Sequence, residues 1–584
     1  MENGNLRPRK HLSLLFLVSL SLNFSTSSFA QSNEIIFADQ GAEWTPSIRS
    51  AFYTQDQGSR IMPLKWMQAL KRSDGNGFLQ DELTEYGYLS NPDTPGIPVG
   101  FTVAQHRGNA SIGMTCAAYH TRQIEVQGQK IRIDGGPGIV DFQSFLSSLD
   151  EAVGIVVNDS TAFTQFSESV IGAQATSTQK LELKQELDLW YLRFHTLMEA
   201  ALPDIPWGPS RLDAVSMIFN RLAGLDIGEP PSYLIPENIA VADAPTRYPF
   251  LWNAARQDHT QWPGFSKNGN SLFGLARNLG EVYGVFAEFH PVKSNSIFRE
   301  HNYLKNNSAN FEGLEKVEDA IWLLGPPKWP WPLDQQLVEK GKEVFSRSND
   351  AGGCVGCHGI KRGEIRFGKK STWKTPIQNV GTDTRECEIL KRTVKTGVLE
   401  GAKIPIVGDK LKSEDLVFNV LATAVVNTIL QHGIFSSASE SARASAAATT
   451  DEVELNSPYQ DVESAFDVEL FQTQLTSNVE EGCKYESRVM EGIWAAAPYL
   501  HNGSVSSLEE LLKPANERAS EFMIGTDYDI DSVGMAKEQS RFGYTLVTTG
   551  CDDINSGNSR CGHEFGTDLD PEEKRALIEY LKFL

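Results

Sequence analysis

Apolar residues recur at every third or fourth position in several parts of the chain, which is the pattern of a helix with one buried face. Alternation of apolar and polar residues is rarer, as at 124–133, and predicts short strands. Stretches rich in Gly, Pro and Asn lie between the periodic segments and predict irregular loops. Together these patterns predict a mainly α fold with long irregular loops and few short strands. The helical stretches are 181–200, 337–345, 507–512 and 571–584.

A proline-rich segment divides the chain. Residues 325–332 read GPPKWPWP, and a helix cannot continue through successive prolines. We therefore predict one domain at 31–328 and a second at 329–584. Within the second domain, the stretch at about 436–456 begins with a run of Ala and Ser and is expected to form an exposed insertion.

The first thirty residues have the three parts of a secretory signal peptide. They combine a basic start, an apolar run at 12–22 and a small-residue end at 28–30. The apolar run is too short to span a bilayer, and no later segment has eighteen consecutive apolar residues. The sequence therefore predicts cleavage after residue 30, a periplasmic or secreted location, and no membrane span.

The chain is acidic, with 75 Asp and Glu against 53 Lys and Arg and a formal net charge of −22. Such a charge is unfavourable for binding nucleic acid or an anionic membrane. It favours solubility, and it also suits docking to basic redox proteins or holding divalent cations.

Seven cysteines are too few for a disulfide scaffold in a chain of 584 residues. Cys551 and Cys561 bracket a polar stretch that reads as a loop, and we expect a disulfide to close it. Cys387 and Cys483 are expected either to pair in the same way or to remain as two buried thiols.

The strongest motif is CVGCH at 354–358, the attachment pattern of c-type haem. In that pattern Cys354 and Cys357 add to the two vinyl groups, and His358 binds the iron. A zinc knuckle would need a second Cys and His pair nearby, and a thioredoxin-like redox pair would need no histidine. The sequence therefore predicts one haem c.

A haem iron with a second axial ligand suits electron transfer, whereas an iron with an open axial position can catalyse a reaction. We favour His501, which lies in the aromatic and small-residue segment WAAAPYLHNGS at 494–504. The alternative is that His501 only hydrogen-bonds within its loop. The other candidates downstream of the motif are His432, Met490 and His563.

A second and weaker motif is CAAYH at 116–120. Cys116 and His120 have the spacing of a haem motif, but Tyr119 stands where the second thiol belongs. Taken alone, this spacing would carry little weight.

The surroundings of this second motif resemble a known family. The segments GMTCAAYHT at 113–121 and IRIDGGP at 131–137 are similar to the N-terminal haem region of large di-haem cytochromes. These cytochromes are related to rubber oxygenases and, more distantly, to bacterial di-haem cytochrome c peroxidases. The likeness extends over nearly the whole chain after the first thirty residues. It includes the segments 63–66, 248–252, 276–282, 498–504 and 572–584.

The resemblance implies two cytochrome-c-like halves, each with a haem. The N-terminal haem would be the reactive centre, with His120 as its proximal ligand, and the C-terminal haem would relay electrons. His358 would then be the proximal ligand of the C-terminal haem and His501 its distal ligand. In this family an aromatic residue usually lies between the haems. Trp262 is the first candidate for this bridge and Trp252 the second. The alternative is that both are ordinary core aromatics. The peroxidase relatives also bind calcium, for which the sequence suggests no ligands.

Tyr119 departs from the family pattern. A haem at this site would be attached by a single thioether at Cys116 or held only by His120. Alternatively, the site has no haem. The phenol of Tyr119 itself is a candidate for oxidation near the iron. Polar partners on the far side of the pocket are not evident from the sequence, although His106, His259 and His290 lie in the same half.

Two functions follow. The first is an exported haem oxidoreductase whose C-terminal haem transfers electrons and whose N-terminal haem activates peroxide or dioxygen. Its partners would be a small redox protein and a small-molecule substrate. The second is a mono-haem electron carrier whose N-terminal half survives as a docking domain. The number of haems separates the two.

Overall fold

The structure is a computed structural model that describes all residues except 2–33, 297–298, 367–369, 406–407, 445–482 and 542. The predicted signal peptide lies outside the described residues apart from Met1, and so does most of the predicted insertion. No described helix is long and apolar enough to cross a membrane.

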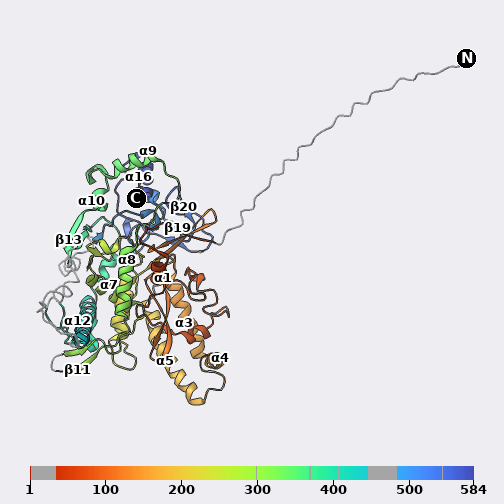
Figure 1. Cartoon of the computed structure of the whole chain (residues 1–584), viewed down its shortest axis with the longest axis vertical. Helices are drawn as coiled ribbons and strands as arrows, with labels where there is room; N and C mark the ends of the chain where they lie inside the picture. Colours follow the sequence, from red (N-terminus) through yellow and green to blue (C-terminus); the bar gives the residue numbers. More distant parts are fainter. Residues whose placement is uncertain (2–33, 297–298, 367–369, 406–407, 445–482, 542) are drawn as a thin grey trace.

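The fold is a mixed α/β fold, with about 39% of residues in helices and 18% in strands (Figure 1). The prediction of a mainly α fold was therefore wrong. Many strands are only two or three residues long, and such short pairings leave no alternating pattern in the sequence. Two examples are β9 (His259–Thr260), which pairs with β10 (Ser266–Lys267), and β15 (Ile377–Gln378), which pairs with β18 (Tyr485–Glu486).

Two antiparallel hairpins frame the weaker motif. The first joins β3 (Phe101–His106) to β4 (Asn109–Met114), and the second joins β5 (Thr121–Val126) to β6 (Gln129–Asp134). Both two-residue turns have positive φ at each central residue, as the right-handed twist of a hairpin favours. The 3₁₀ helix η2 (Cys116–Ala118) fills the short connection between the hairpins. A Cβ atom on Gly100, whose φ is +78°, would lie 2.0 Å from the main-chain nitrogen of Ala118, so the chain packs tightly behind the motif.

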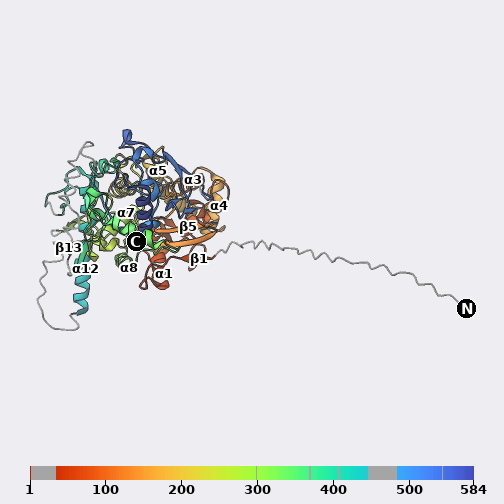
Figure 2. The same cartoon turned by 90° about the horizontal axis from the view of Figure 1, so that it is seen from above.

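Three helices form a lobe on one side of the molecule. They are α3 (Phe142–Asn158), α4 (Ser160–Ile171) and α5 (Ser177–Ala201), and the helix predicted at 181–200 lies within α5. A capping box between Thr176 and Gln179 starts α5 four residues earlier than predicted. Figures 1 and 2 show this lobe on the side opposite α12 (Val417–Ala444).

The second half contains the other two predicted long helices. They are α9 (Gln335–Phe345) and α16 (Pro571–Phe583), which pack against each other. A Cβ atom on Gly341 would lie 1.9 Å from the carbonyl oxygen of Ala576, so only glycine permits this close approach. The stretch predicted at 507–512 forms only the single turn α15 (Leu508–Leu511), capped by Ser507.

One hydrophobic core crosses the predicted domain boundary. It joins Phe250 and Trp252 from the first half to Trp494 and Tyr499 from the second. A separate core surrounds α7 (Ser271–Gly284), and α12 also contributes to it. The boundary at 328 stays a prediction, but the two halves bury side chains together.

The remaining α and π helices are α1 (Pro46–Thr54), α2 (Leu64–Ala69), α6 (Ala214–Phe219), η3 (Asn220–Asp226), α8 (Phe311–Leu323), α10 (Val355–His358) and α11 (Arg385–Ile389). The other 3₁₀ helices are η1 (Thr84–Tyr86), η4 (Pro236–Asn238), η5 (Ala254–Arg256), η6 (Asn349–Ala351), η8 (Gly397–Leu399), η9 (Ile493–Ala496), η10 (Ala515–Glu517) and η11 (Cys551–Asp553). The other strands are β1 (Ile35–Phe37), β2 (Met62–Pro63), β7 (Arg211–Leu212), β8 (Thr246–Arg247), β11 (Val292–Ser296), β12 (Arg299–Asn302), β13 (Arg362–Arg366), β14 (Lys370–Trp373), β16 (Thr393–Lys395), β17 (Glu414–Leu416), β19 (Glu521–Met523), β20 (Tyr528–Asp529), β21 (Gly534–Met535) and β22 (Thr545–Val547). Strand β1 pairs in parallel with β6, and the other ladders between named strands are antiparallel.

Candidate functional site

The complete motif forms a single helical turn, α10, after the loop that follows α9. The main-chain nitrogens of Cys357 and His358 both donate to the carbonyl oxygen of Cys354, at 3.1 and 2.9 Å. Neither Cys354 nor Cys357 is in a disulfide. The turn therefore presents two free thiols and an imidazole together.

This turn borders a cavity of about 1270 Å³. Its lining is mainly apolar and brings both motif thiols together with a few polar groups, which is the usual character of a cofactor site. The lining includes three histidines, one methionine and several aromatic side chains. Members of the lining are Cys354, Cys357, His358, His501, His563, Met490, Trp262, Phe345, Tyr485 and Tyr499.

The His358 ring is oriented by the main chain. Its Nδ1 lies 2.7 Å from the carbonyl oxygen of Arg488. A carbonyl can only accept, so Nδ1 carries the hydrogen and Nε2 keeps its lone pair when the ring is neutral. Burial lowers the pKa of His358 and favours that neutral form. Metal-binding histidines are commonly held in this way.

Two other histidines in the lining, His501 and His563, are candidates for the ligand position opposite His358. The ring of His563 has its centre 6.1 Å from that of His358, with 49° between the ring planes. Its Nδ1 is buried without a hydrogen-bond partner, and burial lowers the pKa of His563 to about 3. A metal ion would be a natural partner for such an atom.

His501 is placed differently, although it lines the same cavity. Its ring stacks on Tyr485, with centres 3.8 Å apart and a 20° angle between planes. Its pKa is lowered to about 3, first by burial and then by Arg247 and Arg211. The ring of His432, the other histidine candidate, stacks on Phe311 instead, and His432 is not part of this cavity.

The weaker motif makes the same turn as the complete one. The main-chain nitrogens of Tyr119 and His120 donate to the carbonyl oxygen of Cys116, at 3.1 and 2.9 Å. Cys116 is not in a disulfide. Positions 116, 119 and 120 thus have the same hydrogen-bond pattern as positions 354, 357 and 358.

A second cavity of about 1250 Å³ borders this turn and includes Cys116, Tyr119 and His120 in its lining. The Nδ1 of His120 lies 2.8 Å from the carbonyl oxygen of Pro249 and therefore donates to it. Burial lowers the pKa of His120 to about 4, so its ring is neutral and Nε2 is available as a ligand. The cavity and the histidine orientation are both retained although the second thiol is missing.

Tyr119 points its hydroxyl into the core. The phenol oxygen donates to the sulfur of Met114 at 3.3 Å, and the ring packs edge-on against Phe142. The Nε2 of Gln57 donates a hydrogen bond to the sulfur of Cys116, and burial raises the pKa of that thiol to about 12. Tyr119 therefore lines the cavity with its ring while its hydroxyl is engaged elsewhere.

A shared wall separates the two cavities. Arg247, Phe250, Glu486 and Arg488 appear in the lining of both. The guanidinium of Arg488 lies 4.2 Å from the centre of the Phe250 ring, and its Nη1 donates to the carbonyl oxygen of Phe250 at 2.8 Å. The carbonyl that accepts from His358 belongs to Arg488, and the carbonyl that accepts from His120 belongs to Pro249, the residue before Phe250. The hydrogen bond from Arg488 to Phe250 therefore connects the supports of the two histidines.

The predicted bridging aromatics stand beside this wall. Trp262 lines only the C-terminal cavity, where Arg247 covers its ring at 4.9 Å. Trp252 lines neither of the two cavities and stacks on Phe250, with ring centres 4.6 Å apart. Phe250 is the aromatic side chain common to both linings.

The N-terminal cavity contains a buried acid that the sequence analysis missed. Glu281 lies on α7, and its Oε1 accepts a hydrogen bond from Gln261 at 2.9 Å. Burial raises the pKa of Glu281, an effect that the nearby Arg277 partly opposes. The signal was present, because polar residues at 277, 278 and 281 fall close together on an otherwise apolar helix.

The histidines considered for this role lie elsewhere. His106 contacts Glu288 at 2.7 Å, and the ring of His290 stacks on Tyr233. His259 lies 3.4 Å from Asp258. None of the three is part of the lining of the N-terminal cavity.

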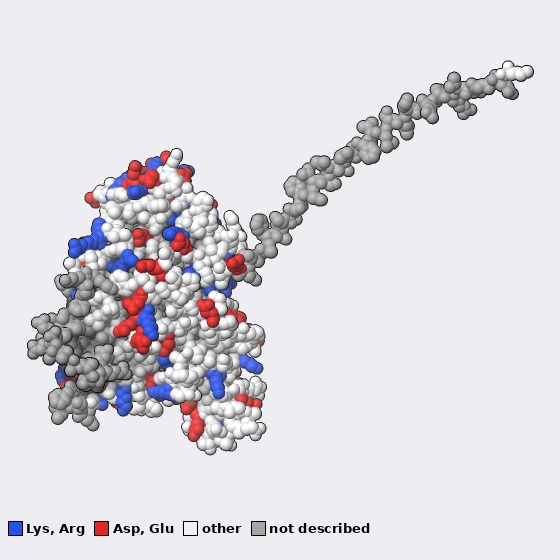
Figure 3. Space-filling model, in the orientation of Figure 1, with Lys and Arg blue, Asp and Glu red and all other residues white. Residues whose placement is uncertain are grey.

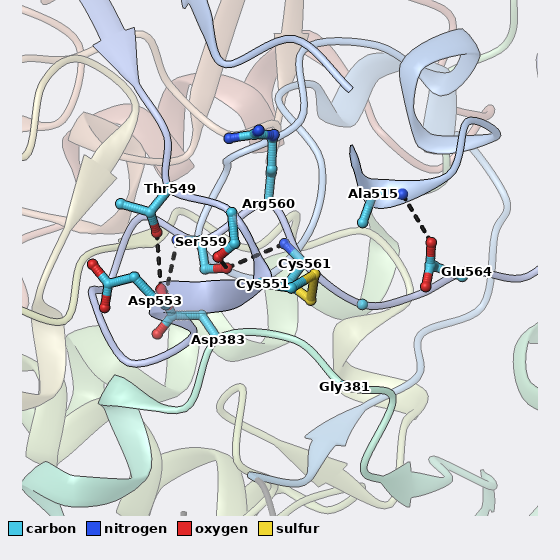
Figure 4. Close-up of a disulfide and its surroundings, with 12 residues drawn as sticks. Gly381, Asp383, Ala515, Thr549, Cys551, Asp553, Ser559, Arg560, Cys561 and Glu564 are labelled. Carbon is cyan, nitrogen blue, oxygen red and sulfur yellow. Dashed lines mark hydrogen bonds between the residues drawn. A yellow bond between two sulfur atoms is a disulfide. The ribbon is translucent and has the colours of Figure 1, made fainter. Parts of the chain in front are cut away.

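Cys387 and Cys483 form a disulfide rather than remaining two buried thiols, and the expected disulfide Cys551–Cys561 is confirmed. The first packs with Trp262 and Tyr485 beside the C-terminal cavity. The second closes the predicted polar loop, and Figure 4 shows Ser559 in this loop bonded to Asp383 of a distant segment. Among the described residues, no group of three or more His, Cys, Asp or Glu is placed to hold a metal ion, so no calcium site can be assigned there.

Comparison with known proteins supports the cytochrome assignment. Residues 484–523 match the family described as RoxA-like, cytochrome c-like. This segment contains Glu486 and Arg488 of the shared wall, and also His501. A cytochrome c-like domain implies haem c, and the match supports a c-type haem oxidoreductase related to RoxA-like cytochromes.

Two proteins of Sinorhizobium fredii are similar to the chain. The uncharacterized protein y4iJ is 27% identical over 638 residues, which cover 98% of this chain and 96% of that protein. The uncharacterized protein y4iM is 34% identical over 116 residues, which cover 17% of this chain and 27% of that protein.

Proposed function

We propose that the protein is an exported oxidoreductase with two c-type haems, in which the C-terminal site transfers electrons and the N-terminal site activates peroxide or dioxygen. The observation that carries the proposal is the pair of similar cavities. Each borders a motif turn whose histidine donates from Nδ1 to a main-chain carbonyl. Haem c supplies reversible one-electron chemistry and, where one axial position is open, a place to bind and activate an oxidant.

At the C-terminal site, Cys354 and Cys357 would form the thioethers and His358 would be the proximal ligand. We propose His563 as the distal ligand in place of His501. An imidazole nitrogen would lie about 2 Å from a bound metal and the ring centre roughly 1.2 Å further, so two rings that held the same metal from opposite sides would have centres about 6.4 Å apart. The rings of His358 and His563 meet that requirement at 6.1 Å. With both axial positions filled, this site suits electron transfer.

At the N-terminal site, Cys116 would form a single thioether and His120 would be the axial ligand. Glu281 would serve as acid and base for the oxidant, because burial raises the pKa of its carboxyl and so makes that carboxyl a better proton acceptor than an exposed one. Gln261 orients this carboxyl by donating to it. An acid and base of this kind favours peroxide over dioxygen as the oxidant.

Electrons would pass between the sites through the shared wall. Phe250 lines both cavities, and Arg488 bonds to its carbonyl while its own carbonyl holds His358. Trp262 remains a second route next to His501, with ring centres 6.5 Å apart. The two disulfides and the predicted signal peptide support an oxidising, exported location.

The alternative of a mono-haem carrier finds less support. A docking domain that had lost its cofactor would have no need for a cavity that keeps Cys116 and an oriented His120 in its lining. The test is hydrogen peroxide turnover by the full chain with a reduced artificial donor. We expect turnover by the native protein and none by His120→Gly, with the haem of the C-terminal site still present. Equal turnover by both proteins would contradict the proposal.

A further inference from the structure

Exposed basic side chains gather beside the complete motif. Arg256, Lys361, Arg362 and Lys374 are all solvent-exposed. Figure 3 shows basic side chains at the edge of the molecule near α10 and β13. The sequence from 361 to 374 has six Lys or Arg and one Glu, although the whole chain carries −22.

These four side chains lie on one continuous part of the fold. The main-chain nitrogen of Lys374 donates to the carbonyl of Lys361 at 2.8 Å, next to the pairing of Arg362 with Trp373. The guanidinium of Arg256 lies 5.5 Å from the centre of the Trp373 ring. We call the four residues, together with Ile360 and Ile365, the basic hairpin surface.

The charges of this surface are not neutralised internally. In the part of the chain that the structure describes, none of its four basic side chains forms an ion pair with an acid. The nearby Glu364 pairs with Arg366 instead. Elsewhere, exposed lysines such as Lys328, Lys395 and Lys410 do pair with acids. A cluster of unpaired positive charge in an acidic protein produces a strong local field.

The surface also exposes apolar side chains between its charges. Ile360 and Ile365 are 53% and 62% exposed. A small apolar centre with a charged rim is the usual composition of a protein interface, and electron-transfer encounters are small and weak.

The surface adjoins the turn of the complete motif. The Nζ of Lys361 donates to the carbonyl of Gly356, between the two cysteines, at 2.8 Å. Beyond Lys374 the chain reaches Gln378, whose Nε2 donates to the sulfur of Cys357 at 2.7 Å. A protein seated here would lie beside the turn that carries Cys354, Cys357 and His358, whose residues are all half-buried.

We propose that the basic hairpin surface is the docking site for an acidic electron-transfer protein that exchanges electrons with the C-terminal site. The net charge of the chain alone favours a basic partner, but the charge beside the redox site has the opposite sign. Complementary charge would steer an acidic partner to this face. The proposal rests on the proposed function, because it assigns the partner of that C-terminal site.

The test measures binding of an acidic plant-type ferredoxin to the full chain, with a basic mitochondrial cytochrome c as the opposite probe. The variant combines Lys361→Glu, Arg362→Glu and Lys374→Glu. The matched control combines Lys65→Glu, Lys71→Glu and Lys305→Glu. These three exposed lysines form no ion pair in the described part of the chain, and their replacement changes the net charge equally. Haem content is measured for each protein by the pyridine haemochrome assay.

We expect the native protein to bind ferredoxin more weakly as salt rises from about 20 to about 200 mM. At low salt the hairpin variant should lose about tenfold or more in affinity and the control less than about twofold. Equal losses in variant and control would overturn the proposal, and so would tighter binding of cytochrome c at this surface. The proposal would also fail if the hairpin variant lost binding only to phosphatidylserine vesicles and still bound ferredoxin. Failure with normal haem content would leave the proposed function intact, whereas loss of haem in the native protein would remove that function.

Discussion

His120 and His358 are held in the same way, with Nδ1 2.8 Å from the carbonyl of Pro249 in one case and 2.7 Å from that of Arg488 in the other. The motif turns that carry them also share their main-chain hydrogen bonds. A lost cofactor site would have no reason to keep the orientation of its ligand. The similarity therefore favours two working sites in one chain.

The distal ligand of the C-terminal site can be identified by substitution. His563→Ala should convert this haem from the low-spin to the high-spin form, because its second axial nitrogen is lost. His501→Ala should change the spectrum little, since His501 stacks on Tyr485. Ultraviolet–visible and electron paramagnetic resonance spectra of both variants provide the measurement. A high-spin His501→Ala with a low-spin His563→Ala would reverse the assignment.

The carboxyl of Glu281 should be required for reaction with peroxide. Glu281→Gln keeps an oxygen for the hydrogen bond from Gln261 but cannot accept a proton. The rate of reaction with hydrogen peroxide should fall about 10²-fold or more, with unchanged haem content. Stopped-flow absorbance measures this rate.

Glu312→Gln is the matched control, because Glu312 is a glutamate outside the cavity that pairs with Lys316 on α8. It should react at the native rate. An unchanged rate in Glu281→Gln would show that this carboxyl does not handle the proton.

Stability should depend on pH through Glu386, which is 3% exposed and has an unpartnered Oε2. Burial, followed by repulsion from Asp213, raises the pKa of Glu386 well above 4.5. The folded chain therefore keeps this proton at pH values where the unfolded chain has released it, and stability falls as pH rises above 4.5 toward the folded-state pKa.

Glu386→Gln should remove this penalty. Its advantage over the native protein in the free energy of unfolding should grow as pH rises above about 5, by at most about 1.4 kcal/mol per pH unit, until the pH passes the folded-state pKa of Glu386. Urea denaturation at each pH is the measurement. Glu388→Gln on the same helix, where Glu388 pairs with Lys391, should show no such growth. A constant difference for Glu386→Gln would contradict the argument.

The disulfide Cys387–Cys483 should contribute strongly to stability, because it closes a loop with a sequence separation of 96. Replacing both cysteines with serine should lower the free energy of unfolding by about 4.7 kcal/mol. The shorter loop of Cys551–Cys561, with a separation of 10, should cost about 3 kcal/mol or less. Urea denaturation compares the two double variants, and a larger loss for the shorter loop would contradict the loop-entropy argument.

Local signals predicted much of this molecule. The motif at 354–358, the helices α5, α9 and α16 and the disulfide Cys551–Cys561 are visible as spacing or periodicity over short stretches. The pairing of Cys387 with Cys483 was one of two alternatives, because the two cysteines lie 96 residues apart. The small sheets were missed, because strands such as β9 and β10 are too short to show a period. This is why the fold class was wrong.

The parts of the site formed by distant segments were also missed. His563 lies far from His358 in the chain, and only the fold brings their rings to 6.1 Å. The prediction of His501 rested on the aromatic and small residues of 494–504, but the ring that stacks on His501 belongs to Tyr485, outside that segment. Phe250 and Arg488 come from opposite halves, so their contact could not be inferred from either segment alone.

The number of covalent haems tests the account most directly. A pyridine haemochrome assay with the intact mass of the purified protein should give two haems per chain, and Cys116→Ser should remove one of them from the denatured polypeptide. The free vinyl left by a single thioether should also shift the haemochrome band, and Tyr119→Cys should move it back toward that of an ordinary haem c. One covalent haem per native chain, with no second haem extracted by acid and solvent, would contradict the two-site account.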